Sequence, residues 1–266
     1  MFTTNPFSIL AETVSPIALQ SFVIVMVALV IIGTLVDIIH KKNVKYFFEN
    51  AKKAKLSATK TLSAGEKISV ISKTIVSDIG TTSELGAGKR RVAHLLGMYG
   101  TILFWTGSVI MIFCYSSPSS DTPSYWPIIW HVGAIMTVVG GSWFWFFLRV
   151  DVYSEAHPWY RIIKADLFVL ALIASSLFGL IWSCLQSLDL NDRWDDKVFL
   201  VLYIISNFVL FGGVYWSKFA HMFYKPGASI QKNLAEADGS RDNLPPPADA
   251  PEQYGLGIDR EKAKHY

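Results

Sequence analysis

The sequence predicts an all-α integral membrane protein built as a bundle of five transmembrane helices. Hydrophobic residues make up 52% of the 266 residues, and the mean hydropathy is +0.35, which is too apolar for a soluble domain with a largely polar surface. Aromatic residues reach 14%, which suits the Trp and Tyr belts that form where a bilayer meets water. Lipid is therefore the expected solvent for most of the chain.

Five apolar stretches are long enough to cross about 30 Å of hydrocarbon, which takes roughly 20 helical residues. The first of them lacks the basic segment that opens a signal peptide, so we expect it to remain as a membrane helix. Small residues inside several stretches are expected to let neighbouring helices pack closely. The five stretches are residues 17–39, 92–115, 126–148, 163–185 and 198–219.

The distribution of basic residues predicts the orientation in the membrane. Of the 24 Lys and Arg residues, only Arg193 and Lys197 lie in the connections that would face outward. Because basic residues accumulate on the cytoplasmic side, we expect the N-terminus outside and the C-terminus in the cytoplasm. The predicted location is the inner, cytoplasmic membrane of the cell, crossed several times.

Four regions follow from this pattern. Residues 1–40 hold the N-terminal segment and the first membrane helix, and residues 92–226 hold the other four. Residues 41–91 form a basic cytoplasmic segment with an amphipathic stretch at 43–55 and a second helix near 65–78, which either lies on anionic headgroups or docks a cytoplasmic partner. Residues 227–266 contain Pro245, Pro246 and Pro247 and are expected to form a mobile cytoplasmic arm.

The two cysteines, Cys114 and Cys184, limit the cofactors that this chain can hold. An iron–sulfur cluster needs several thiolates, and a structural zinc site needs a Cys/His set at short spacing. Neither pattern occurs in the sequence. The two cysteines fall at similar depth, so they are either inert buried thiols or a disulfide.

Two histidines at the cytoplasmic ends of membrane helices are the leading site candidates. His94 opens the second predicted helix, and His221 follows the fifth, so the two rings fall at similar depth. Two imidazoles from different helices at one depth are what a low-spin haem b requires for its two axial ligands. The flanking cations are expected to neutralise the haem propionates, and they are Arg90, Arg91, Lys218 and Lys225. The alternative is that both rings merely sit at the headgroup boundary.

The remaining histidines are weaker candidates. His131, near the outer end of the third helix, either belongs to an aromatic belt or donates a hydrogen bond to a quinone carbonyl. His157 precedes Pro158 in a cytoplasmic loop and could replace one of the two ligands. His40, with Asp37 on the same helix face, could do so too or could relay protons.

The sequence segments that contain His94 and His221 resemble those of a known family. Arg-Val-Ala-His-Leu-Leu at 91–96 and Lys-Phe-Ala-His-Met-Phe-Tyr-Lys-Pro at 218–226 resemble the cytochrome b membrane subunits of the nitrate reductase gamma type. Within that group the chain is most similar to the membrane part of the quinone-interacting oxidoreductase associated with adenylylsulfate reductase, and to stand-alone membrane anchors of the AprM type. The resemblance covers residues 90–227.

The resemblance implies a membrane anchor that passes electrons between the quinone pool and a cytoplasmic iron–sulfur flavoprotein through haem b. The partner would be adenylylsulfate reductase or a heterodisulfide-reductase-like complex, and the chain would be a non-catalytic or quinone-reactive subunit. His94 and His221 match the cytoplasmic-side haem ligands. Two-haem members carry further histidines deeper in the second and fifth helices, where this chain has Phe104, Trp105, Tyr203 and Asn207, so one haem is expected.

A single haem near the cytoplasm favours a quinone site on the same side. We expect that site near His157, Trp159, Tyr160 and Lys164. Two other functions stay open at this point: a haem-free structural anchor that recruits a reductase to the membrane, and, more weakly, a small transporter or channel subunit.

Overall fold

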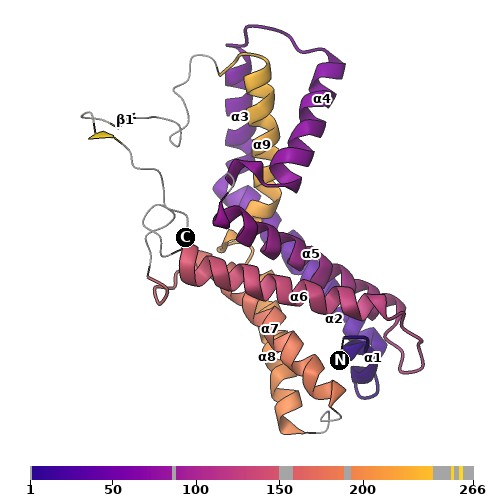
Figure 1. Cartoon of the computed structure of the whole chain (residues 1–266). Coiled ribbons are helices and arrows are strands. Elements are labelled where there is room, and N and C mark those ends of the chain that lie inside the picture. Colours follow the sequence, from indigo (N-terminus) through magenta and orange to yellow (C-terminus); the bar gives the residue numbers. More distant parts are fainter. Residues whose placement is uncertain are drawn as a thin grey trace.

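The chain is helical, as the sequence predicts. The computed structural model (Figure 1) describes residues 2–85, 88–149, 158–188 and 193–241, and the strand pairs 253–254 and 258–259. The longer helices are α2 (Pro16–Lys41), α3 (Asn43–Lys55), α4 (Ala64–Thr74), α5 (Lys89–Cys114), α6 (Tyr125–Trp143), α7 (Leu167–Ser187), α8 (Trp194–Gly212) and α9 (His221–Ala237).

Shorter elements connect or extend these helices. A five-residue helix, α1 (Pro6–Leu10), precedes α2, and two π-helical segments, η1 (Ile75–Gly80) and η3 (Phe144–Leu148), continue α4 and α6. The 3-10 turns are η2 (Ser83–Leu85), η4 (Lys164–Asp166) and η5 (Lys218–Ala220). The strands β1 (Gln253–Tyr254) and β2 (Ile258–Asp259) pair antiparallel.

Four helical segments of the described chain are long and apolar enough to cross a membrane. They are Pro16–Lys41, Lys89–Cys114, Tyr125–Leu148 and Lys164–Ser187, which match the first four predicted stretches. The fifth differs, because α8 begins with Asp195, Asp196 and Lys197 in its first turn and ends at Gly212 instead of Phe219. Its uncharged part, 198–212, spans about 22 Å at 1.5 Å per residue, less than the usual hydrocarbon thickness.

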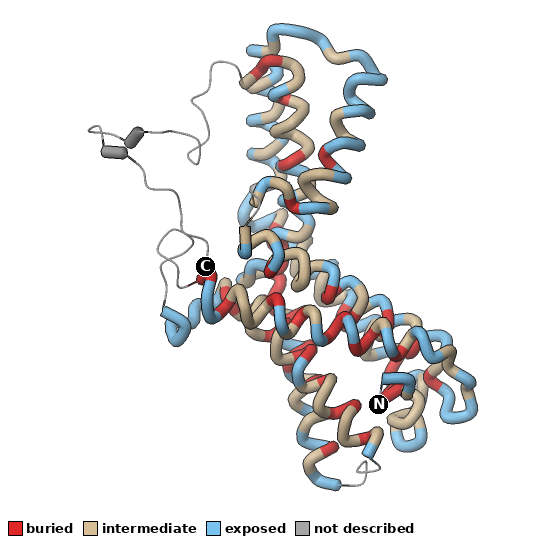
Figure 2. Tube along the Cα trace, viewed as in Figure 1, coloured by how far each residue is buried: buried red, intermediate tan, exposed pale blue. Residues whose placement is uncertain are grey.

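Small residues bring α5 and α6 together, as expected for a membrane bundle. A Cβ added to Gly100 would lie 2.6 Å from the Thr137 nitrogen, and one added to Gly133 would lie 2.5 Å from the Phe104 nitrogen. Figure 2 shows buried positions recurring along the facing sides of these two helices. Gly212 differs, because a Cβ there would meet nothing within 4 Å.

A second helical unit stands apart from the membrane helices. In Figure 1, α3, α4 and α9 lie side by side beyond the N-terminal end of α5. The elements α4 and η1 pack against α9. The predicted helices at 43–55 and 65–78 correspond to α3 and to α4 with η1. The prediction of a mobile arm from residue 227 is wrong for its first part, because α9 continues through Gly227 to Ala237 and packs its Ser229 and Asn233 onto η1.

Asp78 joins the elements of this second unit. Its carboxylate accepts hydrogen bonds from Ser83 at 2.7 Å, from Ser77 at 2.8 Å and from Asn233 of α9 at 2.6 Å. These hydrogen bonds, led by the one from Ser83, outweigh the effect of burial and lower the pKa of Asp78 to about 2. The carboxylate is therefore ionised at neutral pH and joins α9 to the turn that follows α4.

Candidate functional site

The structure places His221 differently from the sequence-based expectation. The residue was expected directly after a continuous fifth membrane helix, but α8 ends at Gly212 and His221 is the first residue of α9. The chain turns between these helices, and the Ser217 hydroxyl accepts a hydrogen bond from the Phe219 backbone N–H at 3.2 Å to begin η5. His221 therefore lies at the junction of the bundle with the extramembrane unit.

His94 and His221 lie close enough at this junction for their charges to interact. His94 lies in the second turn of α5, and the charges of His221, Lys225 and Arg90 act on its ring. Among the residues that the structure describes, the His94 Nδ1 atom is buried and has no hydrogen-bond partner. A buried ring nitrogen without a partner loses its hydrogen bonds to water without replacement, which is unusual for a structural histidine.

The His221 ring is oriented for ligation by its other nitrogen. Nδ1 donates a hydrogen bond to the Lys218 carbonyl oxygen, and the ring packs edge-on against Phe168 of α7 with centroids 5.5 Å apart. Part of the ring surface stays exposed, yet desolvation by its surroundings lowers the pKa of His221. The neutral ring with a proton on Nδ1 leaves the Nε2 lone pair for a metal, which is the usual arrangement of a metal-binding histidine.

The four cations expected near the propionates divide into two groups. The charges of Lys225 and Arg90 act on the His94 ring, and those of Lys225 and Lys218 act on the His221 ring. Arg91 instead donates through Nε to the Thr81 carbonyl oxygen at 2.7 Å and so joins α5 to the turn after η1. Lys225 also pairs with Glu84 at 3.6 Å.

The residues expected to form the quinone site lie on an exposed segment. His157 lies outside the described residues. Trp159 and Tyr160 are exposed and contact each other edge-on with centroids 5.9 Å apart, and Lys164 opens η4. The structure brings Trp159 and Tyr160 together on the surface, and Lys164 lies in the same loop.

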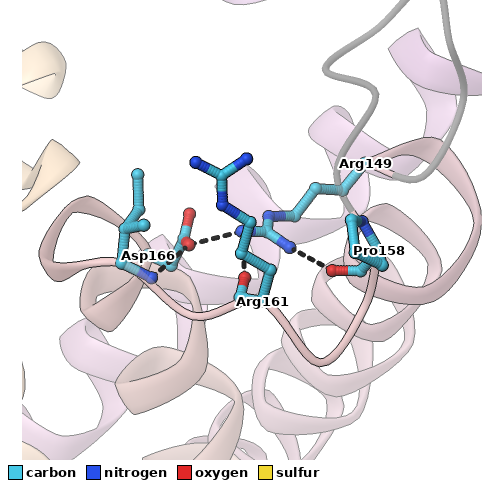
Figure 3. A network of polar contacts seen from close by, with 5 residues as sticks. Arg149, Pro158, Arg161 and Asp166 are labelled. Carbon is cyan, nitrogen blue, oxygen red and sulfur yellow. Dashed lines mark hydrogen bonds and ion pairs between the residues drawn. The ribbon is translucent and has the colours of Figure 1, made fainter.

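A buried ion pair, which the sequence patterns do not predict, anchors that loop. The Arg149 guanidinium lies 2.5 Å from the Asp166 carboxylate and donates to the carbonyl oxygens of Pro158 at 3.1 Å and Arg161 at 2.6 Å (Figure 3). It also lies over the Trp145 ring at 4.1 Å. The signal in the sequence was an Arg and an Asp at the facing ends of two consecutive apolar runs.

The other candidate histidines have structural partners. His131 is fully buried, and its ring nitrogens bond to the Pro127 carbonyl oxygen at 2.7 Å and to the Ser183 hydroxyl at 2.8 Å. Both nitrogens are therefore occupied within the protein, which disfavours the quinone alternative. His40 packs against Tyr215 with ring centroids 6.0 Å apart.

Asp37 pairs with residues other than the neighbour that the sequence suggested. Its carboxylate forms an ion pair with Lys41 and accepts a hydrogen bond from the Tyr224 hydroxyl of α9 at 2.9 Å. Desolvation and this carboxylate together raise the pKa of Tyr224 to about 12. Asp37 thus connects α2 to α9.

Phe104, Trp105, Tyr203 and Asn207 are the residues that the sequence resemblance singled out in place of deeper histidines, and three of them line one apolar cavity. Trp105 of α5 lies there with Tyr203 and Asn207 of α8. Phe104 packs edge-on against Tyr203 with centroids 6.4 Å apart. No cluster of three or more His, Cys, Asp or Glu side chains able to hold a metal ion occurs in the described part of the chain, and both cysteines are free thiols.

Comparison with known proteins identifies no similar protein. The sequence matches no protein-family model and no curated protein, and the structure matches no solved structure.

Proposed function

We propose that this chain is a membrane anchor and electron-transfer subunit, with His94 and His221 as the two axial ligands of one haem b. The observation that supports the proposal is the buried His94 Nδ1, which has no partner among the described residues, together with the charge interaction between this ring in α5 and His221 in α9. A bound haem would supply one-electron redox chemistry. These residues suit that group, since His94 and His221 offer two ring nitrogens and the charges of neighbouring cations act on both rings.

Residues around His94 and His221 would orient the two rings and balance the negative charge of the haem propionates. Arg90, Lys218 and Lys225 are close enough to the two rings for their charges to act on them, which suits the carboxylates of haem propionates. The Lys218 carbonyl oxygen holds the His221 ring through Nδ1. Arg91 is committed to Thr81 and is better regarded as a structural residue.

The contact between α4 and α9 supports five membrane crossings. Elements that touch outside the membrane lie on one side of it, so the chain between α4 and α9 must cross an even number of times. Three spans, in α5, α6 and α7 with their extensions, lie between them, and α8 is the element available for the fourth crossing. Together with α2 this makes five, and the basic residues then favour the cytoplasm for α3, α4 and α9.

The cytoplasmic partner in this proposal is an iron–sulfur flavoprotein, and the electron source or sink in the membrane is quinone. The two cysteines and the absence of a Cys/His set leave this chain without an iron–sulfur cluster of its own. The family resemblance points to adenylylsulfate reductase or a heterodisulfide-reductase-like complex, in the inner membrane. The exposed Trp159 and Tyr160 with Lys164 remain the proposed quinone contact.

Reduced-minus-oxidised optical spectra of the purified full-length protein test the haem. We expect a b-type α-band that is lost in His94→Ala and in His221→Ala, because each removes an axial ligand. His40→Ala is the matched control, since His40 also lies at a helix end but only packs on Tyr215. A protein without any α-band would leave the haem-free anchor as the remaining function.

A further inference from the structure

A long, partly open apolar cavity along α2 takes no part in the proposed haem site. Its volume is about 530 Å³, and it lies between α2, α5 and α8, with α1 and Trp182 of α7 at one end and residues of η5 and α9 at the other. Ligand sites in proteins have volumes of this order and are lined mainly by apolar side chains with a few polar groups. Its lining includes neither His94 nor His221.

The shape of the cavity fits a hydrocarbon chain. The α2 residues that line it run from Ala18 to Ile31, which corresponds to about 20 Å along a helix. Phe7 and Trp182 lie at the α1 end, and Phe219 and Phe223 lie at the α9 end. A cavity of this length covers more than one leaflet of the roughly 30 Å hydrocarbon core.

Two indole N–H groups border this apolar space without a partner. Trp182 is fully buried and Trp105 is partly buried, and in both the Nε1 atom is buried with no hydrogen-bond partner among the described residues. An unsatisfied buried donor is costly. The cost is greatest at Trp182, whose side chain has no access to water, so an occupant with an acceptor oxygen near that indole would relieve it.

The chemistry of the lining favours an unreactive lipid over a quinone in redox use. Among the described lining residues there is no Asp, Glu, His, Lys or Arg. Quinone reduction takes up protons, and the described lining offers only the weakly acidic phenol of Tyr203 as a donor. A hydrocarbon chain with an ester carbonyl needs only apolar walls and one donor.

We propose that this cavity binds one chain of an ester-linked membrane phospholipid, whose ester carbonyl oxygen accepts a hydrogen bond from the Trp182 indole N–H. The lipid would fill the space that remains between α2 and the α5/α8 wall, beside the direct contacts that α2 makes with both helices. This binding is independent of haem and of the cytoplasmic partner.

Native mass spectrometry of the delipidated full-length protein, titrated with dioleoylphosphatidylglycerol in detergent, tests the site. We expect one tightly bound lipid per chain. Val23→Trp fills the cavity from α2 and Leu200→Trp fills it from α8, and each should reduce binding by about tenfold or more, since each takes the volume of several methylene groups. Ile24→Trp is the matched control, because Ile24 neighbours Val23 but is 59% exposed and lies outside the lining.

Trp182→Phe removes the N–H and keeps the ring, and we expect binding to weaken by about fivefold, the effect of one net hydrogen bond. Circular dichroism shows whether each variant is folded. Equal lipid binding in Val23→Trp, Leu200→Trp and Ile24→Trp would overturn the site. An effect of Trp105→Phe without one of Trp182→Phe would overturn the carbonyl assignment, and isoprenoid quinone as the only molecule extracted from the native protein would overturn the choice of lipid.

Discussion

The Arg149 guanidinium and the Asp166 carboxylate lie 2.5 Å apart, and both side chains are almost fully buried. Arg149 follows η3 at the end of α6, and Asp166 ends η4 at the start of α7. The pair therefore closes the connection between these two helices and sets the position of the segment that carries Trp159 and Tyr160.

Asp166→Asn should strongly destabilise the protein. It removes the carboxylate charge that lies 2.5 Å from the buried Arg149 guanidinium, and breaking a buried pair in this way costs about 3 to 5 kcal/mol. Denaturant unfolding of the purified protein, followed by circular dichroism, measures the loss.

The control for this prediction is Asp195→Asn. Its partner Arg193 lies 3.0 Å away but is more than half exposed, so we expect a change below about 1 kcal/mol. Equal losses in the two variants would contradict the assigned role of Arg149 and Asp166.

Gly100→Ala should disrupt the packing of α5 on α6. The added Cβ would lie 2.6 Å from the Thr137 backbone nitrogen, and backbone atoms cannot move aside as a flexible side chain can. We expect a loss of about 1 to 3 kcal/mol or more from overpacking, measured as a lower unfolding midpoint.

Gly97→Ala on the same helix should be tolerated. A Cβ there meets nothing within 4 Å, and alanine is the better helix former by about 1 kcal/mol. If both substitutions lowered the midpoint equally, close contact between the backbones of α5 and α6 would not be the cause.

Acidification should release α9 from α4. The pKa of Asp78 is about 2 in the folded protein against 3.8 for the free group, so its ionised form stabilises the fold above about pH 4, and this stability is lost as the pH falls from 3.8 through 2. Thermal unfolding at pH 3 and pH 5 should show a smaller difference in Asp78→Asn than in the wild type. Glu49→Gln on α3 removes only an exposed pair with Lys45 and should keep the full difference.

Cysteine labelling tests the proposed orientation. The background carries Cys114→Ser and Cys184→Ser. We expect Ser119→Cys, between α5 and α6, to react with a membrane-impermeant maleimide in spheroplasts, whose inner membrane is intact. Thr61→Cys between α3 and α4 should react only after the inner membrane is opened. Both positions are exposed in the structure, and the reverse pattern would invert the topology.

Much of this architecture was predictable from the sequence. The four longest apolar stretches are helices within a few residues of their predicted bounds, because a segment in lipid must satisfy its backbone hydrogen bonds internally. The amphipathic stretch at 43–55 corresponds to α3, and the packing role of Gly133 and Gly140 follows from their lack of a side chain. Hydropathy and residue size determine these features locally.

Tertiary structure decided what depends on contacts between distant residues. The tail beyond Gly227 looked too polar to fold alone, but Asp78 and Glu84 provide partners for Ser229 and Asn233, so α9 extends to Ala237. Asp37 pairs with Tyr224, 187 positions away, instead of with His40. Local patterns carry no information on such pairings, because a hydrogen bond depends on where the fold brings its two atoms.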